Sequence, residues 1–273
     1  MAPIDLLAIG HVTRDRLEAG FTTGGTVTYG ALAARALGSV PAIVTSAGPD
    51  LLSSLPDVDT HVVTAAKSTA FRNDYGPGGG RTQHIEGVAK PLSPSDVPRE
   101  WQGARSVLLG PLVGEVDAAL ARFFPNSLVV ASVQGWLRHW DSTGLVIPRG
   151  WSGLDVLPYI DAVVVSIDDI VDDEQISQWS EIVPVLVVTQ GSKGARLHAK
   201  GRWHTIPAFA AQEVDPTGAG DVFAAAFALM LLETGDPVRA ATFASCDASF
   251  AVEAQGTSNL PTRAQVDERL TTG

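Results

Sequence analysis

A run of small residues that ends in a carboxylate stands directly before a long apolar segment. The run is Asp215-Pro216-Thr217-Gly218-Ala219-Gly220-Asp221, and the apolar segment covers residues 224–232. Glycines let a backbone approach a ligand closely, and the free N–H groups of a first helical turn bind anions such as a phosphoryl oxygen. Asp221 would then lie beside an anion site, where a carboxylate can accept the proton of an attacking hydroxyl. A glycine-rich turn in which Asp221 only favours the start of the helix explains the same residues.

Two better-known phosphate motifs are excluded by the sequence. No Gly-x-x-x-x-Gly-Lys-Ser/Thr occurs, so the chain has no P-loop. Gly218 and Gly220 form a Gly-x-Gly pair, but Phe223 stands where a dinucleotide fingerprint has its third glycine. An anion site at this turn is therefore of another kind.

Composition limits the partners of the protein. The chain has 273 residues, of which 45% are hydrophobic and 18% are charged, and its formal net charge is −11. Because Lys and Arg form no cluster, we expect no binding to nucleic acid or to an anionic membrane. The N-terminus begins with a strand-like run, without a charged leader, and no apolar stretch reaches about 18 residues. We expect a cytoplasmic protein.

Short apolar runs alternate with segments of helical spacing along the chain. The strands and helices that they predict must position the glycine-rich turn and Asp221. Strands are predicted at residues 6–9, 42–45, 107–109, 128–131, 162–165 and 185–188, and helices between them at 29–37, 116–123 and 168–179. Continuous apolar runs are typical of buried parallel strands, and the alternation is typical of βαβ units. The sequence therefore predicts an α/β fold with a mostly parallel sheet.

Two segments break this alternation. Residues 69–86 contain two polar strand-like pieces around Gly76-Pro77-Gly78-Gly79-Gly80, and they predict a hairpin that projects as a flap or lid. Residues 195–198 and 202–206 predict a second hairpin, after which helices are expected at 218–231, 237–253 and 262–270. No interdomain linker is visible, so we expect one domain over residues 1–273.

Three motifs resemble, in order, those of the ribokinase-like (PfkB) carbohydrate kinases. Asp215-Pro216-Thr217-Gly218-Ala219-Gly220-Asp221-Val222-Phe223 is similar to the C-terminal signature of that family, and Gly24-Gly25-Thr26-Val27-Thr28-Tyr29-Gly30-Ala31 to its N-terminal Gly-Gly motif. Thr189-Gln190-Gly191-Ser192-Lys193-Gly194 is similar to its nucleotide-binding Thr-x-Gly-x-x-Gly turn. The resemblance implies a three-layer α/β/α sandwich and a kinase that uses ATP and Mg²⁺ to phosphorylate a small sugar or polyol.

The resemblance also implies roles for the matching residues. Asp221 would be the catalytic base, and the backbone amides of Gly218, Ala219 and Gly220 the anion hole. The nucleotide would contact Ser166, Thr189, Gly191, Gly194, Gly218 and Gly220, and the substrate would contact Asp15, Gly24 and Gly25. A tight turn at Gly191 and Gly194, and a solvent-exposed Asp15, are the alternatives.

Two positions depart from the family pattern. Ser166-Ile167-Asp168-Asp169 stands where many members have Asn-x-x-Glu, so Asp169 would hold Mg²⁺ through water while Ser166 replaces the amide. Tyr29 stands where an Asn often contacts the sugar. This second departure weakens an assignment to ribose or fructose.

One further segment bears on the substrate. Gln134-Gly135-Trp136-Leu137-Arg138 resembles the Gln-Gly-x-x-Arg stretch of the inositol kinases, and Arg81-Thr82-Gln83 in the flap resembles the same subgroup. A polyol needs paired donors and acceptors, which Asp15, Gln134 and Arg138 can supply. Myo-inositol is therefore the leading substrate. In the alternative, Arg138 forms a surface salt bridge and Gln134 caps a helix.

Other functions stay open on the sequence. Tyr29, Phe71 and Trp136 are compatible with a kinase for a nucleoside or another sugar. A sugar-binding regulator that has lost phosphoryl transfer is a further alternative. The protein is expected to be a monomer, or a homodimer formed through the edge of the flap.

Overall fold

A nine-stranded sheet forms the centre of the computed structural model, which describes residues 3–17, 20–75 and 81–272. Its strands, in spatial order, are β15 (Arg202–Ile206), β14 (Ala195–Ala199), β13 (Val185–Thr189), β12 (Ala162–Ser166), β9 (Leu128–Ser132), β8 (Ser106–Leu109), β1 (Leu6–Ile9), β4 (Pro41–Ala47) and β5 (Asp59–Thr64). The strands from β13 to β5 are parallel, while β14 and β15 are antiparallel to their neighbours. All six predicted parallel strands and the predicted 195–206 hairpin are confirmed.

The parallel strands are apolar along their whole length because both faces of the sheet are covered. In β1, Leu7 and Ile9 belong to the core on one face, whereas Leu6 belongs to the core on the other. All four residues of β1 are buried. This two-sided burial explains why the sequence shows apolar runs without alternation.

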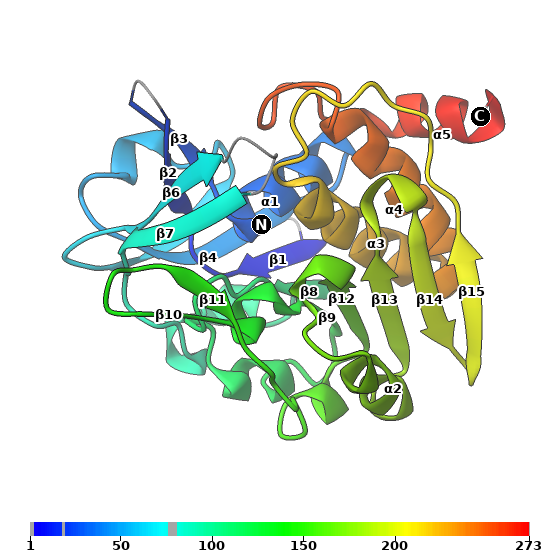
Figure 1. Cartoon of the computed structure of the whole chain (residues 1–273), viewed down its shortest axis with the longest axis horizontal. Coiled ribbons are helices and arrows are strands. Elements are labelled where there is room, and N and C mark those ends of the chain that lie inside the picture. Colours follow the sequence, from blue (N-terminus) through cyan, green and yellow to red (C-terminus); the bar gives the residue numbers. More distant parts are fainter. Residues whose placement is uncertain (1–2, 18–19, 76–80, 273) are drawn as a thin grey trace.

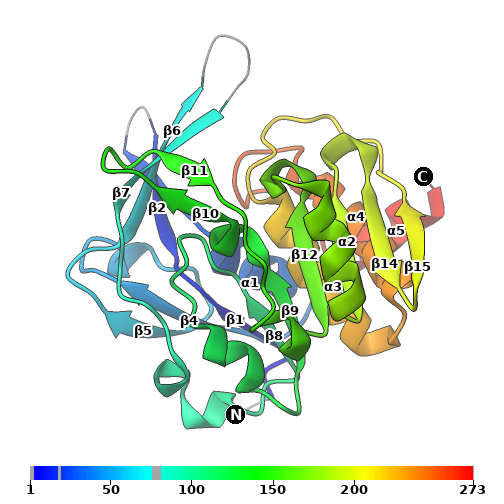
Figure 2. The same ribbon diagram turned by 60° about the horizontal axis from the view of Figure 1, so that its bottom comes forward.

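Long helices cover one face of the sheet (Figures 1 and 2). They are α1 (Thr26–Ala36), α3 (Ala219–Thr234) and α4 (Pro237–Ala251), and α5 (Arg263–Thr272) packs on α4. The helix α3 is apolar all round because it lies between the sheet and its neighbours α1 and α4. No helix in the described ranges is both long and apolar enough to cross a bilayer.

The other face carries a thinner layer, in which α2 (Asp173–Ile182) is the one regular helix among the described residues. The helix predicted at 116–123 is wrong: a 3₁₀ turn covers Ala118–Arg122. The backbone around Val116 is held extended, since Leu92 and Val116 form a β-bridge, and Pro125 follows closely. The helix predicted from residue 168 begins later, at Asp173, because the side chain of Asp172 caps it by accepting from Glu174 N.

A second, four-stranded sheet rises beside the C-terminal ends of the parallel strands (Figure 2). Its order is β3 (Phe21–Gly24), β2 (Thr13–Arg16), β6 (Thr69–Tyr75) and β7 (Arg81–Gly87). The strands β6 and β7 pair antiparallel, as expected for residues 69–86, and the glycine-rich turn 76–80 lies outside the described residues. The sequence did not indicate that β2 and β3 belong to this sheet.

A small hairpin of β10 (Arg138–Trp140) and β11 (Val146–Pro148) borders β7. The backbone N–H of Ile85 donates a 2.8 Å hydrogen bond to the carbonyl of Gly144, in the turn of this hairpin. His84 and Leu145 form an antiparallel bridge beside it. The outer edge of β7 is therefore partly covered by the chain itself.

Candidate active site

A pocket of about 1170 Å³ opens where the parallel strands end. Ser132, Ser166 and Thr189, the last residues of β9, β12 and β13, line it. The pocket continues past the start of α3 to the small sheet and to α4. Ligands of open α/β sheets bind outside the carboxyl ends of the strands, so this pocket is the expected place for a functional site.

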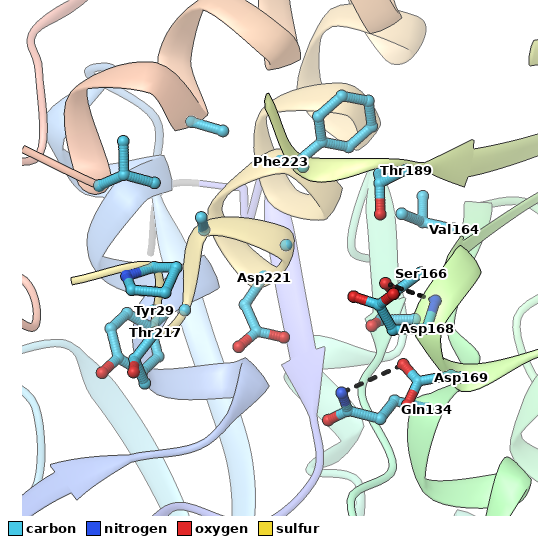
Figure 3. A pocket seen from close by; sticks show the side chains of 18 of the residues that line it. Tyr29, Gln134, Val164, Ser166, Asp168, Asp169, Thr189, Thr217, Asp221 and Phe223 are labelled. Carbon is cyan, nitrogen blue, oxygen red and sulfur yellow. Dashed lines mark hydrogen bonds between the residues drawn. The ribbon is translucent and has the colours of Figure 1, made fainter. Parts of the chain in front are cut away.

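The starts of α1 and α3 meet at Asp221. The hydroxyl of Thr26, in the first turn of α1, donates a 2.7 Å hydrogen bond to Oδ1 of Asp221, in the first turn of α3. Thr26 is 1% exposed, whereas Asp221 faces the pocket (Figure 3). The bond fixes the orientation of the carboxylate and leaves Oδ2 toward a ligand.

Gly218 shapes the turn that precedes α3. Its φ of 82° lies in the left-handed region, and a Cβ there would collide with the ring of Tyr29. Tyr29 is 3% exposed; its ring packs against Gly218, and it also lines the pocket.

Unpaired donors surround this turn. The N–H of Ala219 donates to the carbonyl of Pro216 at 3.3 Å. Within the described residues, the N–H groups of Gly218 and Gly220 make no such bond. A Cβ on Gly220 would meet open space, which is the room that a ligand needs to approach these donors. The geometry is therefore that of an anion site at a helix start.

The environment of Asp221 shifts its acidity. Desolvation on the floor of the pocket raises the pKa of Asp221 to about 6. The hydrogen bond from Thr26 and the positive charge of Arg138 lower this pKa, while the negative charges of Asp15 and Asp169 raise it further. Asp221 is thus a carboxylate that is ionised at neutral pH with a pKa close to that pH, as suits a general base.

The predicted substrate residues of the N-terminal part lie together. Asp15, on β2, accepts a 3.0 Å hydrogen bond from the hydroxyl of Thr13, and both side chains line the pocket. Gly24 lies directly behind, because a Cβ there would collide with the Asp15 carboxylate. Gly25, at the N-cap of α1, also lines the pocket.

Gln134 and Arg138 converge on Asp169. Nε and Nη2 of Arg138 donate to Oδ1 of Asp169 at 3.1 and 2.6 Å, and Nε2 of Gln134 donates to Oδ2 at 3.3 Å. The side chain of Asp169 is 8% exposed and that of Arg138 23%. This ion pair lies in the pocket and not on the surface, and Gln134 binds a carboxylate and does not cap a helix.

Four of the six predicted nucleotide residues, Ser166, Thr189, Gly191 and Gly194, lie across the pocket from Asp221, whereas Gly218 and Gly220 lie in the turn beside it. Thr189 ends β13 and Gly191 begins the 3₁₀ turn Gly191–Lys193, which Gly194 closes. Ser166 ends β12, and its hydroxyl accepts from the backbone N–H of Asp168 at 3.2 Å. Figure 3 shows Ser166, Asp168, Asp169 and Gln134 across the pocket from Asp221.

The residues at this end suit a magnesium ion held through water. Ser166, Asp168 and Asp169 offer the oxygen ligands that Mg²⁺ prefers. In the described part of the chain, no group of three or more His, Cys, Asp or Glu could hold a metal. A metal here would therefore need phosphate oxygens and water as further ligands. Because Asp169 is engaged by Arg138 and Gln134, the exposed Asp168 has the more accessible carboxylate.

Comparison with known proteins shows what the sequence and the fold are similar to. Residues 154–263 match the model of the pfkB family carbohydrate kinases. A pyrophosphate-dependent kinase in the ribokinase family, solved with a pyrophosphate analog and myo-inositol, has the same fold, with a TM-score of 0.79, 20% identity, and coverage of 97% of this chain and 99% of that one. The chain therefore has the ribokinase-like fold. The Arabidopsis thaliana ribokinase, solved with ribose and ATP, superposes with a TM-score of 0.74 at 22% identity, with 99% of each chain covered.

The match to curated sequences of this family is shorter. The nucleoside kinase of Methanocaldococcus jannaschii is 41% identical over 98 residues, which are 35% of this chain and 32% of that kinase. The aligned part spans about a third of the length of the first curated relatives.

Two functional contacts escaped the sequence analysis. Thr26 belongs to the Gly-Gly motif, but nothing in its local sequence indicates that its hydroxyl reaches a residue 195 positions away. Gln83 was noted only as part of a resemblance, whereas its Oε1 accepts a 3.3 Å hydrogen bond from Nη1 of Arg138. Both contacts join segments that are distant in sequence, so only the fold reveals them.

Proposed function

We propose that the protein is an ATP-dependent kinase that phosphorylates a hydroxyl of a small sugar or polyol. One observation carries the proposal: Asp221 has a pKa close to neutrality, is oriented by Thr26, and stands beside the unpaired N–H groups of Gly218 and Gly220. A base next to an anion site is what transfer of a phosphoryl group to an alcohol requires.

In the proposed reaction, the acceptor hydroxyl lies between Asp15 and Asp221. Asp221 Oδ2 takes its proton while the hydroxyl oxygen attacks the γ-phosphorus, and the bond to the ADP oxygen breaks. The amides of the turn before α3 stabilise the charge of the transferring group. Mg²⁺ bound with ATP would neutralise phosphate oxygens, with Ser166, Asp168 and Asp169 holding its water ligands.

The donor end of the pocket favours ATP over pyrophosphate. It is lined by small or apolar residues, which include Ala208, Phe209, Ala248 and Val252, and such a wall suits a purine base. Arg138 is the one Lys or Arg among the described lining residues. A donor of dense charge, such as pyrophosphate, would call for more cations.

Myo-inositol is the leading acceptor. The acceptor end presents Asp15, Gln83 and Gln134, which together supply donors and acceptors for a ring that carries only hydroxyls. The solved neighbour with myo-inositol supports this choice. The small sheet of β2, β3, β6 and β7 would act as a lid on a single kinase domain of residues 1–273.

A nucleoside is the second candidate acceptor. Apolar residues also line the pocket, among them Phe71, Leu112 and Val146, which pack together, and a base can pack on such a surface. The similarity to the nucleoside kinase of Methanocaldococcus jannaschii supports this alternative.

A donor and acceptor panel tests the proposal. The purified protein is incubated with Mg²⁺ and either ATP or pyrophosphate, together with myo-inositol, ribose, fructose, cytidine or adenosine, and product formation is followed by mass spectrometry. Phosphorylated myo-inositol formed from ATP is the expected product. Turnover of a nucleoside instead would replace the acceptor and keep the kinase. Sugar binding without any turnover would favour a non-catalytic regulator.

A further inference from the structure

Arg138 lies at the centre of a hydrogen-bonded chain that crosses the pocket. Its guanidinium donates to Asp169, which follows β12, and to Gln83 on β7. Gln83 in turn donates a 3.1 Å bond to Oδ1 of Asn73 on β6. One cation therefore joins the donor end of the pocket to the small sheet that borders the acceptor end.

Among the described residues that line the pocket, carboxylates outnumber the cation of Arg138. Five lining residues carry a carboxylate: Asp15, Asp168, Asp169, Glu213 and Asp221. Arg138 alone, among the described lining residues, carries a fixed positive charge. A phosphoryl group that enters this pocket would be repelled by the carboxylates, unless a cation faces it.

Two N–H donors of the Arg138 guanidinium are not used by its hydrogen bonds to the protein. An arginine has five N–H donors, and the contacts to Asp169 and Gln83 occupy three of them. The two that remain have no partner in the described part of the chain, and they are one N–H on each terminal nitrogen. Two such donors in one plane match two oxygens of a phosphoryl group.

The position of the guanidinium favours phosphate over a hydroxyl of the acceptor. It is anchored by Asp169 in the turn after β12, and Figure 3 shows Asp169 with Ser166 and Asp168 across the pocket from Asp221. It also lies close enough to Asp221 for its charge to influence that carboxylate. The group that passes between the donor end and Asp221 during transfer is the phosphoryl group.

We propose that Arg138 is a catalytic residue that binds two non-bridging oxygens of the transferring phosphoryl group, held in place by Asp169 and Gln83. The inference rests on the proposed kinase function. In the step, the acceptor oxygen forms its bond to phosphorus, the bond between phosphorus and the ADP oxygen breaks, and the proton goes to Asp221. Arg138 stays protonated throughout and stabilises the charge on the group between the two oxygens.

Kinetics of Arg138→Gln and Arg138→Lys test the role. We expect Arg138→Gln to lower kcat by about 10²–10³-fold, because a lost charge-stabilising donor costs that much, while the KM values for ATP and acceptor change less than threefold. Arg138→Lys is expected to recover part of the rate. Arg149→Gln is the matched control, since Arg149 is an exposed arginine just after β11 that donates to the carbonyl of Trp136 and does not line the pocket. It should keep the wild-type kcat.

Two further measurements separate this role from a structural one. Guanidinium chloride at low millimolar concentration should restore activity to Arg138→Ala, and NaCl at the same ionic strength should not. Calorimetric binding of MgADP with aluminium fluoride, a mimic of the transferring group, should weaken more than 100-fold in Arg138→Gln, whereas binding of MgADP alone should not change.

The outcomes test the role of Arg138 and the kinase function separately. A large rise in the acceptor KM with unchanged kcat would show that Arg138 contacts the acceptor, and an unchanged affinity for the aluminium fluoride complex would overturn the proposal directly. The aluminium fluoride comparison needs no acceptor, so it judges Arg138 even where every acceptor in the panel fails. A wild-type protein that does not bind MgADP would refute the kinase function itself.

Discussion

The hydroxyl of Thr26 donates a 2.7 Å hydrogen bond to Oδ1 of Asp221, and so ties the start of α1 to the start of α3. Each helix has a glycine as its N-cap, Gly25 for α1 and Gly218 for α3. The two helices pack along each other behind the sheet, so the bond has little freedom to lengthen. Thr26 is thus a positioning residue, which fixes one oxygen of the proposed base and leaves the other for the acceptor.

Replacing Thr26 tests this positioning. Thr26→Val keeps the shape of the side chain and removes the hydroxyl. We expect kcat to fall about 10–100-fold, since a hydrogen bond to a charged group contributes about 1.5–3 kcal/mol. The bond lowers the pKa of Asp221, so its loss should move the acidic limb of the pH–rate profile to higher pH. Thr26→Ser, which keeps the hydroxyl, is the control. If the acidic limb of the pH–rate profile of Thr26→Val lies at the wild-type pH, Thr26 does not position Asp221.

The pH dependence of the wild-type protein follows from the same carboxylate. Only ionised Asp221 can accept a proton, and desolvation raises its pKa to about 6. We therefore expect kcat/KM to be level above pH 7 and to fall tenfold per pH unit well below pH 6. Initial rates between pH 4.5 and 8.5 check this. An acidic limb below pH 4.5 would mean that Asp221 is not the group that titrates.

Removing the carboxylate gives the sharpest test of the base. Asp221→Asn keeps the size of the side chain and an oxygen that can accept from Thr26, so we expect the fold and the affinity for ATP to be kept. The rate should fall by about 10²–10⁴-fold, the usual contribution of general base catalysis. Rapid-quench kinetics measure the rate, and circular dichroism measures the fold. A folded Asp221→Asn with the wild-type rate would exclude the base.

Gly24 makes room for the proposed substrate contact at Asp15. A Cβ at position 24 would collide with the Asp15 carboxylate, which must then turn away from the acceptor. For Gly24→Ala we expect the acceptor KM to rise about tenfold, with little change in the KM for ATP, because each lost hydrogen bond to a charged group costs about 1.5–3 kcal/mol. Gly103→Ala is the matched control, since a Cβ there meets nothing within 4 Å. Equal changes in both KM values would argue against a specific effect on Asp15.

The sequence predicted what depends on local pattern. Apolar runs located the parallel strands, and the glycines next to Asp221 predicted the turn before α3, because both features are set by neighbours in the chain. The sequence did not predict that β2 pairs with β6 in one sheet, since that pairing depends on the path of the chain. It placed Arg138 and Asp169 in different roles, and the fold shows them as an ion pair of 2.6 Å.

Asp247 offers a test that is independent of function. It lies in α4 with 0% exposure, and neither carboxylate oxygen has a hydrogen-bond partner among the described residues. Burial raises its pKa to about 8 from the ordinary 3.8, so the folded protein keeps this proton over a pH range in which the unfolded chain loses it. The contribution of Asp247 to stability is therefore complete below pH 4 and is lost progressively as the pH rises from about 4 to 8.

Asp247→Asn removes this titration and should change the pH dependence of stability. The free energy of unfolding of Asp247→Asn, relative to wild type, should increase with pH by up to about 1.4 kcal/mol per pH unit between pH 5 and 8. Urea unfolding at pH 5, 6, 7 and 8 measures the difference, and the exposed Asp155→Asn serves as control. A difference that stays constant over this range would show that Asp247 is already ionised in the folded protein, with a cation or water as its partner.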